Sequence, residues 1–234
     1  MNNVLIVGAG RGIGHQLLQY FSRESTAWAT YRATIPEMPA ERRFQLDLDS
    51  ETEMVRVVKE LNLRDVSFNK LVFVGAKTPP LGGPEGGAEF QGGMSTQLFE
   101  QYLRVNALGP LVFFEHLYIA GLIKRPATVV FLSSLAGSIE MRGRLPHNQR
   151  GGNLAYRMSK SALNCGVRNM AYDLSDEGVT VVSLHPGWVQ TGSGGPHADT
   201  DEVTAGAEIA SLIDSISIAD NGKFLRVDGS VIPW

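Results

Sequence analysis

A glycine-rich stretch that directly follows the first apolar run limits what this chain can fold into. The run VLIV is apolar throughout, as in a strand buried on both faces, and GAGRGIG (residues 8–14) comes next. Gly8, Gly12 and Gly14 are spaced G-xxx-G-x-G. Glycine allows positive φ and close backbone approach, so this stretch predicts a tight turn from the strand into a helix. Gly10 adds an overlapping pattern, and the glycines alone therefore leave the subtype of the turn open.

The rest of the chain alternates apolar runs with amphipathic patterns. The runs are near-continuous, which indicates strands buried on both faces and hence a parallel sheet covered by helices. Because crossovers between parallel strands are right-handed, we expect an α/β fold over residues 1–234: a single doubly wound Rossmann-type domain whose parallel seven-stranded sheet has helices on both faces. Ligands of such sheets bind beyond the carboxyl ends of the strands. The expected strands are 4–7, 26–31, 43–46, 71–74, 128–132, 179–184 and 223–227, and the expected helices are 13–21, 51–63, 97–123, 154–177 and 202–213.

Composition and charge agree with this fold class and exclude others. The chain has 234 residues, 43% of them hydrophobic and 19% charged, which is typical of one globular domain. A net charge of −3 with no basic stripe argues against nucleic acid as a partner. The single cysteine, Cys165, cannot form an internal disulfide, and we interpret it as a small buried side chain. We see no signal-peptide pattern and no apolar run as long as a membrane span, so we expect a cytoplasmic protein.

The position of the glycine turn predicts a nucleotide site. Backbone near Gly12 can approach a diphosphate, and the following helix offers it free N–H groups and a partial positive charge. An acidic residue at the end of the second strand would favour NAD, but here that strand ends TYR, with Arg32. Arg32 and Arg11 can both pair with a 2′-phosphate, so NADP is expected, with solvated arginines as the alternative. Asp47, after the third strand, is expected near the adenine amino group, and capping the helix that starts near Ser50 is its alternative role.

A tyrosine and a lysine lie four residues apart in AYRMSK (155–160). Positions i and i+4 share a helical face, so Tyr156 and Lys160 can point into one cleft. Free tyrosine has a pKa of about 10, whereas an ammonium at about 4 Å contributes on the order of 4 kcal/mol at an effective dielectric constant of about 20. That attraction could lower the pKa of the phenol toward roughly 7 before desolvation takes part of it back. The pair therefore predicts a general acid for carbonyl reduction and a base for the reverse reaction.

Together with GAGRGIG, this pair resembles the signature of the short-chain dehydrogenase/reductase family. FLSS, VNALG and PGWVQT stand in the family's order along the chain. YRMSKSALN, LHPGWVQTG and DGSVIPW are most similar to the branch of C-factor and sniffer-type carbonyl reductases. The resemblance implies that Ser134 is the catalytic serine, with Ser133 as the alternative, and that Asn106 in VNALG holds a proton-relay water.

The same resemblance implies a set of cofactor contacts. In PGWVQT the backbone of Val189 and the hydroxyl of Thr191 would bind the nicotinamide carboxamide, and Lys160 would hold the ribose hydroxyls. The implied contacts are Gly8, Arg11, Gly12, Ile13, Gly14, Arg32, Asp47, Leu48, Gly75, Ala76, Tyr156, Lys160, Pro186, Gly187, Val189 and Thr191.

The chain departs from the family pattern in several places. FVGA (73–76) stands where the family has NNAG, so the hydrogen bonds of the asparagines are missing. The gap from Ser134 to Tyr156 is longer than usual and makes the serine assignment less direct. We interpret His185, before Pro186, as structural rather than catalytic.

Two segments without apolar periodicity interrupt the alternation, at 78–94 and 137–153. We expect both to be long loops over the site. The second carries Arg142, Arg144 and His147, which we interpret as solvated, with substrate contact as the alternative.

These features support an NADP(H)-dependent oxidoreductase that interconverts a carbonyl and an alcohol on a small molecule. The alternatives are a dinucleotide-binding redox sensor or signalling protein with little turnover, and a methyltransferase, which would have no need of Tyr156 and Lys160. We expect no metal, no nucleic acid and no membrane partner. The resemblance implies a homodimer or homotetramer that pairs through the long helices 97–123 and 154–177.

Overall fold

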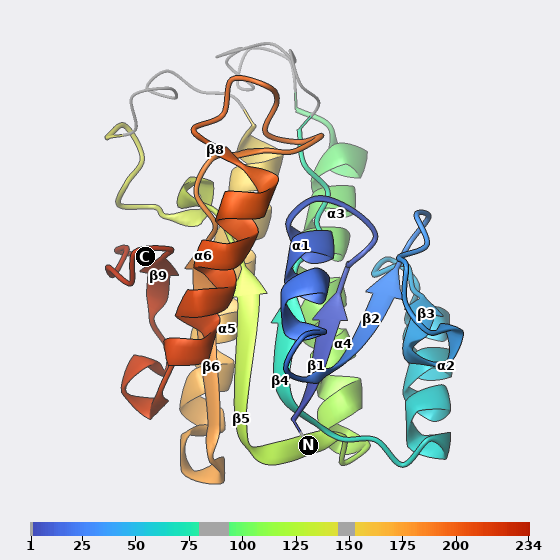
Figure 1. Ribbon diagram of the computed structural model, residues 1–234. Coiled ribbons are helices and arrows are strands. Elements are labelled where there is room, and N and C mark those ends of the chain that lie inside the picture. The colour runs from blue at the N-terminus through green and yellow to red at the C-terminus, as the bar shows by residue number, and fades with distance from the viewer. Residues whose placement is uncertain (1, 80–93, 145–152) are drawn as a thin grey trace.

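A parallel sheet of seven strands forms the centre of the protein, in the order β3-β2-β1-β4-β5-β6-β9 (Figure 1). The computed structural model describes residues 2–79, 94–144 and 153–234. The predicted α/β fold with a doubly wound parallel sheet is confirmed. The strands are β1 (Asn3–Val7), β2 (Thr26–Tyr31), β3 (Arg43–Gln45), β4 (Phe68–Phe73), β5 (Ile123–Leu132), β6 (Val179–His185) and β9 (Phe224–Arg226).

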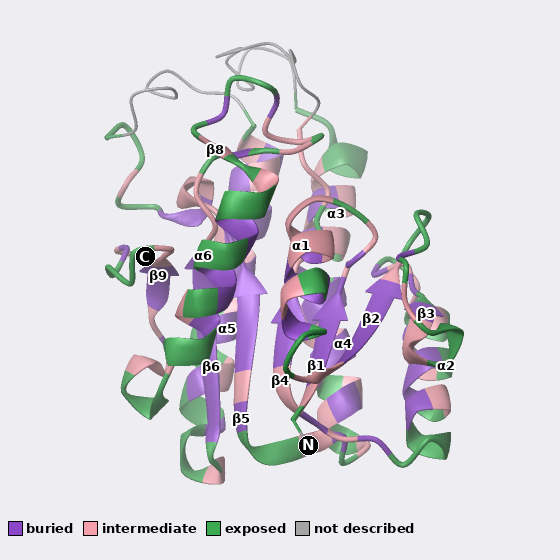
Figure 2. Ribbon diagram, viewed as in Figure 1, coloured by how far each residue is buried: buried purple, intermediate pink, exposed green. Residues whose placement is uncertain are grey.

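Helices cover both faces of this sheet. On one face α1 (Gly12–Phe21) packs beside α6 (Glu202–Ser215), and on the other lie α2 (Glu51–Leu63), α4 (Gly109–Ile119) and α5 (Leu154–Asp173) (Figure 1). Each layer has its own cluster of buried apolar side chains, and the strands between them are buried along most of their length (Figure 2). Burial on both faces explains why the strands read as near-continuous apolar runs.

Local sequence explains where α2 begins and which side it buries. The Ser50 hydroxyl caps the helix by accepting a hydrogen bond from the Glu53 backbone N–H at 3.3 Å. The side chains that follow at helical spacing form its buried side. They are Met54, Val57, Val58 and Leu61.

The helix expected at 97–123 is wrong as a single element. It consists of α3 (Thr96–Leu103), a π-helical turn (Arg104–Leu108) and α4, and β5 already begins at Ile123. The three elements adjoin, and the backbone is right-handed helical at both junctions, so α4 continues from the π turn without a break; Pro110 lies in its first turn. The π turn widens the helix at one point, and apolar periodicity does not register such a change.

Two expectations about α5 also need correction. The helix ends at Asp173 rather than near 177, and a short 3₁₀ turn (Ser175–Glu177) leads to Gly178 with φ of +71°. Cys165 is exposed, not buried. It lies on the side of α5 away from the buried residues Leu163 and Val167.

A small second sheet lies beyond the carboxyl ends of the central strands. Residues Val189–Gln190 (β7) and Thr200–Asp201 (β8) pair in parallel, which the sequence did not predict because each strand has only two residues. Of the loops expected at 78–94 and 137–153, residues 80–93 and 145–152 lie outside the described residues. No helix in the described part of the chain is long and apolar enough to cross a bilayer.

Candidate active site

A cleft of about 1440 Å³ runs along the carboxyl ends of the strands. It brings together almost all of the residues that the sequence suggested for a site. Those that line it are Gly8, Arg11, Gly12, Ile13, Arg32, Asp47, Leu48, Gly75, Ala76, Ser134, Tyr156, Lys160, Pro186, Gly187, Val189 and Thr191. Gly14 and Asn106 are not among the described residues that line it.

The glycine turn is shaped by close backbone contacts. Gly8 has φ of +96°, and a Cβ there would lie 2.6 Å from the backbone nitrogen of Gly75. Gly12, with φ of +56°, opens α1 at the cleft. A Cβ on Gly14 would lie 2.2 Å from the carbonyl oxygen of Gly8, so this glycine allows the helix to pack against the turn and does not reach the cleft. The absence of side chains leaves a cradle of bare backbone where a diphosphate fits.

Two arginines border the cleft near this turn. Arg11 precedes α1 and Arg32 follows β2, and both side chains are exposed. The carboxylates of Asp199 and Glu202 also line the cleft, and Glu202 lies close to Gly12. The arginine pair therefore supplies positive charge at the ends of β1 and β2, partly balanced by acidic residues nearby.

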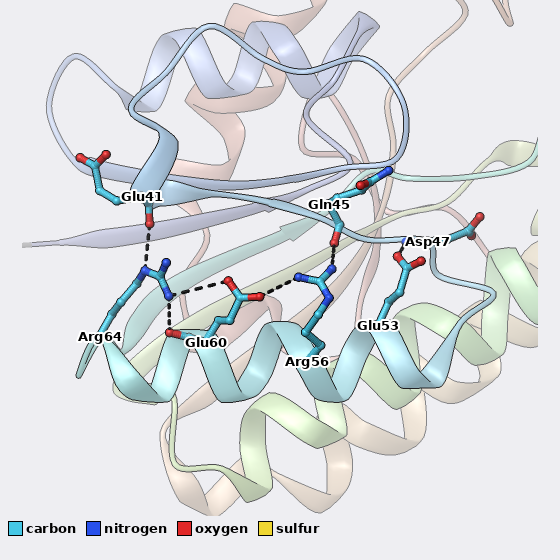
Figure 3. A network of polar contacts seen from close by, with 7 residues as sticks. All are labelled: Glu41, Gln45, Asp47, Glu53, Arg56, Glu60 and Arg64. Carbon is cyan, nitrogen blue, oxygen red and sulfur yellow. Dashed lines mark hydrogen bonds and ion pairs between the residues drawn. The ribbon is translucent and has the colours of Figure 1, made fainter.

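A polar network fixes the segment that follows β3 (Figure 3). The Glu53 carboxylate accepts a hydrogen bond from the Asp47 backbone N–H at 2.7 Å, and the carbonyl of Gln45 accepts one from Arg56. The Asp47 side chain points away from Glu53 (Figure 3) and accepts from the Asp49 backbone N–H at 3.0 Å. Ser50, not Asp47, caps α2, so the capping alternative for Asp47 is wrong. The Asp47 carboxylate lies instead on the wall of the cleft.

Tyr156, in the first turns of α5, lines the cleft together with Ser134, whose side chain interacts with the phenol. Burial raises the pKa of Tyr156 above its ordinary value, and the hydrogen bond with Ser134 lowers that pKa by a smaller amount. The Ser134 hydroxyl also accepts a hydrogen bond from the Ala136 backbone N–H at 3.1 Å. Ser133 is buried, and its hydroxyl has no hydrogen-bond partner among the described residues. The geometry therefore favours Ser134 over Ser133 beside the phenol.

Lys160 lies on the same side of α5, one turn along. It is 3% exposed, its Nζ donates to the carbonyl of Leu132 at 2.8 Å, and burial lowers its pKa to about 8. The expectation that this ammonium lowers the pKa of Tyr156 is not met. The groups that act on the phenol are Ser134, Tyr102 and Arg157, after burial. At both side chains, burial shifts the pKa more than neighbouring charges do. The depth of burial depends on the fold, so a spacing of four residues could not predict this effect.

Asn106 lies in the π-helical turn. Its side chain forms hydrogen bonds within the protein and does not line the cleft. Its Oδ1 accepts from the Lys77 N–H at 2.7 Å, and its Nδ2 donates to the Lys77 carbonyl at 2.8 Å and to the Ser159 hydroxyl at 3.0 Å. The side-chain amide therefore has both donors in use inside the protein. It positions the segment after β4 against α5.

The segment after β6 forms a tight turn over the cleft. The Thr191 hydroxyl accepts hydrogen bonds from the Ser193 and Gly194 N–H groups at 3.1 and 3.0 Å, and the Thr191 N–H donates to the Val189 carbonyl at 2.8 Å. The hydroxyls of Thr78 and Ser193 are 2.9 Å apart, so this turn touches the segment that follows β4. Thr191 thus stabilises the turn that carries the expected carboxamide contacts.

The described arginines of the segment after Ser134 do not line the cleft, although Asn153 at the end of that segment does. Arg144 pairs with Glu140, and neither Arg142 nor Arg144 is among the described residues that line the cleft. His147 lies outside the described residues.

Several lining residues were missed by the sequence interpretation. Arg157, buried beside Tyr156, and Arg226 and Asp228 at the end of β9 all line the cleft. Ligands of doubly wound sheets bind just beyond the carboxyl ends of the strands. Applying this rule to the strand expected at 223–227 would have identified Arg226 and Asp228. Arg157 gave no signal, because a residue next to the tyrosine on a helix would be expected on another face.

Known proteins are similar to this chain in sequence and in fold. A family model described as short chain dehydrogenase matches residues 2–202. The C-signal protein of Myxococcus xanthus is 38% identical over 133 residues, which is 56% of this chain and 75% of that protein. The carbonyl reductase Sniffer of D. melanogaster has a TM-score of 0.82 and 25% identity and covers 100% of both chains. A putative short-chain dehydrogenase/reductase from Burkholderia multivorans with bound NADP has a TM-score of 0.80 and 26% identity, and covers 100% of this chain and 99% of that one.

Proposed function

The chain belongs to the short chain dehydrogenase family, and on that premise we propose that it reduces a carbonyl group of a small molecule to an alcohol with NADPH, with Tyr156 as the proton donor. Membership makes it an oxidoreductase of this type. The observation that carries the finer proposal is that Tyr156, Ser134 and Lys160 line one cleft, where the Ser134 side chain acts on the phenol. Residues 1–234 would act as one NADP-binding domain.

The cofactor is NADP(H). The bare backbone of the glycine turn and the start of α1 would hold the diphosphate, and Arg11 and Arg32 would hold the 2′-phosphate. The Burkholderia relative, which binds NADP, covers the whole of this chain. When bound, the reduced cofactor supplies the hydride, and the residues of the chain supply position and charge.

Tyr156 is suited to donate a proton at neutral pH. Because burial raises the pKa of its phenol, Tyr156 keeps its proton there, as a general acid must. Ser134 would bind the same carbonyl oxygen and orient it toward the phenol. This protonation state favours reduction over alcohol oxidation at neutral pH.

Lys160 would hold the ribose hydroxyls of the cofactor. Since burial lowers the pKa of Lys160 only to about 8, most of its population is protonated at neutral pH. Asn106 acts on this arrangement indirectly, by fixing Ser159 and the Lys77 backbone. Asn106 is a positioning residue in this proposal. Both N–H donors of its side chain are already in use, so a relay water would have to bind to other groups.

The chain would assemble as a homodimer or homotetramer through the side of the molecule that carries α4 and α5. Leu108, Ile119, Met158 and Tyr172 are large side chains on or beside these helices, and all are exposed. Light scattering coupled to size-exclusion chromatography measures the molar mass directly, and a monomer would contradict this assignment.

Replacing Tyr156 with Phe tests the proposed chemistry. The change removes the proton donor and keeps the ring, so kcat for carbonyl reduction should fall at least about a thousandfold. The dissociation constant for NADPH, measured by fluorescence titration, should change by less than about threefold, because the cofactor is held mainly by other groups. Tyr172→Phe on the same helix is the matched control, since Tyr172 is 83% exposed.

Retention of turnover by the Phe variant would refute the role of Tyr156. A wild-type protein that binds NADPH but reduces none of a broad panel of aldehydes and ketones would refute the reductase itself. That result would favour the dinucleotide-binding sensor, for which the replacement of NNAG by FVGA at 73–76 is the motivating feature.

A further inference from the structure

Three polar side chains form a row across the carboxyl ends of β5, β6 and β9. Leu132 pairs with Leu184, and His185 pairs with Arg226, so Ser133, His185 and Arg226 lie at one level of three neighbouring parallel strands. Side chains at one level of a parallel sheet point to the same face. All three residues line the cleft that contains Tyr156.

The row lies on the face of the sheet that α5 covers. Phe131, two residues before Ser133, belongs to the apolar cluster on the side of α4 and α5. Because side chains alternate along a strand, Ser133 shares that face. Tyr156 comes from α5, so the row and the phenol border the same end of the cleft.

The row contains hydrogen-bonding groups that the described protein does not satisfy. Ser133 is 4% exposed, and its hydroxyl and the Nδ1 of His185 are buried without a hydrogen-bond partner among the described residues. No carboxylate in residues 2–79, 94–144 and 153–234 makes an ion pair with Arg226. Buried polar atoms normally have partners, so such a row in a cleft indicates a place for a polar ligand.

The charges around the row favour an anion. Burial, and secondly Arg226, lower the pKa of His185 to about 4, so the ring is neutral at neutral pH. Arg226 and Arg157 both line the cleft as cations. Asp228, two residues after Arg226, accepts hydrogen bonds from Ser230, and these, followed by the charge of Arg226, hold the pKa of Asp228 below its ordinary value. Arg226 therefore brings positive charge to this end of the cleft.

We propose that Arg226 binds a carboxylate of the substrate, with His185 and Ser133 as neighbouring hydrogen-bonding groups, so that the enzyme prefers carbonyl compounds that also carry a carboxylate. The guanidinium fork matches the two oxygens of a carboxylate. The phosphates of NADP(H) are placed elsewhere, at the glycine turn and Arg32, near the opposite edge of the sheet. The inference rests on the proposed function, because it assumes that the substrate occupies the end of the cleft beside Tyr156.

Calorimetric titration of the NADPH-saturated protein tests this without requiring turnover. Alcohols do not react with the reduced cofactor, so 4-(hydroxymethyl)benzoate and 6-hydroxyhexanoate can each be compared with their methyl esters. The wild-type protein should bind at least one acid about tenfold or more tightly than its ester, the size expected for a charge-assisted hydrogen bond. Arg226→Gln should abolish this preference, and Arg226→Lys should keep part of it. Arg23→Gln is the matched control, because Arg23 is exposed and does not line the cleft.

Equal affinities for acid and ester in the wild-type protein, or no binding of either acid, would overturn the inference. An unchanged preference in Arg226→Gln would also overturn it. If that variant fails to fold, the wild-type comparison and its weakening by added salt decide the question alone. A preference that is present in a protein without carbonyl reductase activity would refute the proposed function and leave the anion site standing, so the two failures are distinguishable.

Discussion

At the scale of the residue, Lys160 is a buried ammonium whose environment works against its charge. Its side chain is 3% exposed and its Nζ donates to one backbone carbonyl, that of Leu132. Burial lowers the pKa of Lys160 from 10.5 to about 8. Cofactor hydroxyls would supply further acceptors, so the protein without cofactor keeps a destabilising charge at this position.

Lys160→Met should change how stability depends on pH. Between about pH 8 and 10.5 the unfolded chain binds a proton at Lys160 that the folded chain lacks, so the unfolding free energy of the wild-type protein rises with pH in this window. From pH 7 to 9.5 the wild-type protein should gain roughly 2 kcal/mol relative to the Met variant, at about 1.4 kcal/mol per pKa unit. Urea denaturation of both proteins without cofactor, at several pH values, measures the difference. Parallel stability curves for the two proteins would contradict the buried ammonium.

Arg32 is the residue that should separate the two dinucleotides. Arg32→Ala should weaken NADPH by about ten- to a hundredfold, because a charge-assisted contact to the 2′-phosphate is lost. NADH lacks that phosphate, so its affinity should change by less than about threefold. Fluorescence titrations with both cofactors measure this, and Arg42→Ala is a control at a nearby position outside the cleft. Equal losses for NADPH and NADH would remove the basis for a preference.

Much of the candidate site could be predicted from the sequence, because its residues follow strands or share a helical face. Tyr156, Lys160 and the glycine turn were brought to one cleft as expected. What spacing cannot supply is the environment of each group. The raised pKa of Tyr156 and the engaged amide of Asn106 depend on contacts with residues distant in the chain. Roles in catalysis remain predictions for all of these residues.

At the scale of the element, Gly109 shows how tightly the start of α4 packs. A Cβ on Gly109 would lie 2.1 Å from the carbonyl oxygen of Leu48, in the segment between β3 and α2. That segment lines the cleft through Leu48 and Asp47. The end of the π-helical turn therefore sets the distance between α4 and one wall of the site.

Gly109→Ala should destabilise the protein although alanine is the better helix former. The overlap with backbone should cost about 2 kcal/mol or more, whereas the gain in helix propensity is at most about 1 kcal/mol. Gly192→Ala is the control, because a Cβ there has only the Arg11 guanidinium nearby, at 3.9 Å. Urea denaturation of the three proteins measures the unfolding free energies. A Gly109→Ala variant as stable as the wild-type protein would show that this contact relaxes without cost.

Most strands and helices were predicted to within one or two residues, and α2 has the predicted bounds; β4 and β5, however, begin three and five residues before the predicted starts at 71 and 128. Buried strands are short apolar runs between turns, and β2 has the predicted bounds. The π turn that joins α3 to α4 was missed because the apolar side continues through it from Tyr102 to Phe113, so the periodicity hardly changes. β7 and β8 pair only through tertiary contact, and two residues carry no pattern that could be recognised.

At the scale of the whole molecule, the last residues of the chain connect the sheet edge to the segment that follows the serine of the site. The Trp234 ring stacks on Phe224 of β9 with centroids 5.6 Å apart. The Ser138 hydroxyl donates to the Pro233 carbonyl at 2.6 Å, and the Glu140 N–H donates to the Trp234 carbonyl at 3.0 Å. Contacts that join residues more than ninety positions apart leave no trace in local sequence, so this connection could not be predicted.

Trp234→Ala should therefore loosen a segment far away in the chain. Loss of the ring removes the stack on Phe224, and the unfolding free energy should fall by about 2 kcal/mol, less than for a fully buried tryptophan because Trp234 is 36% exposed. Amide hydrogen exchange across 138–144 should accelerate, since the backbone acceptors for Ser138 and Glu140 are then less firmly held. Val231→Ala, in the same segment but 60% exposed, is the control and should leave the exchange unchanged. Unchanged exchange in Trp234→Ala would show that the segment after Ser134 is held by its own turns, independently of the chain's last residues.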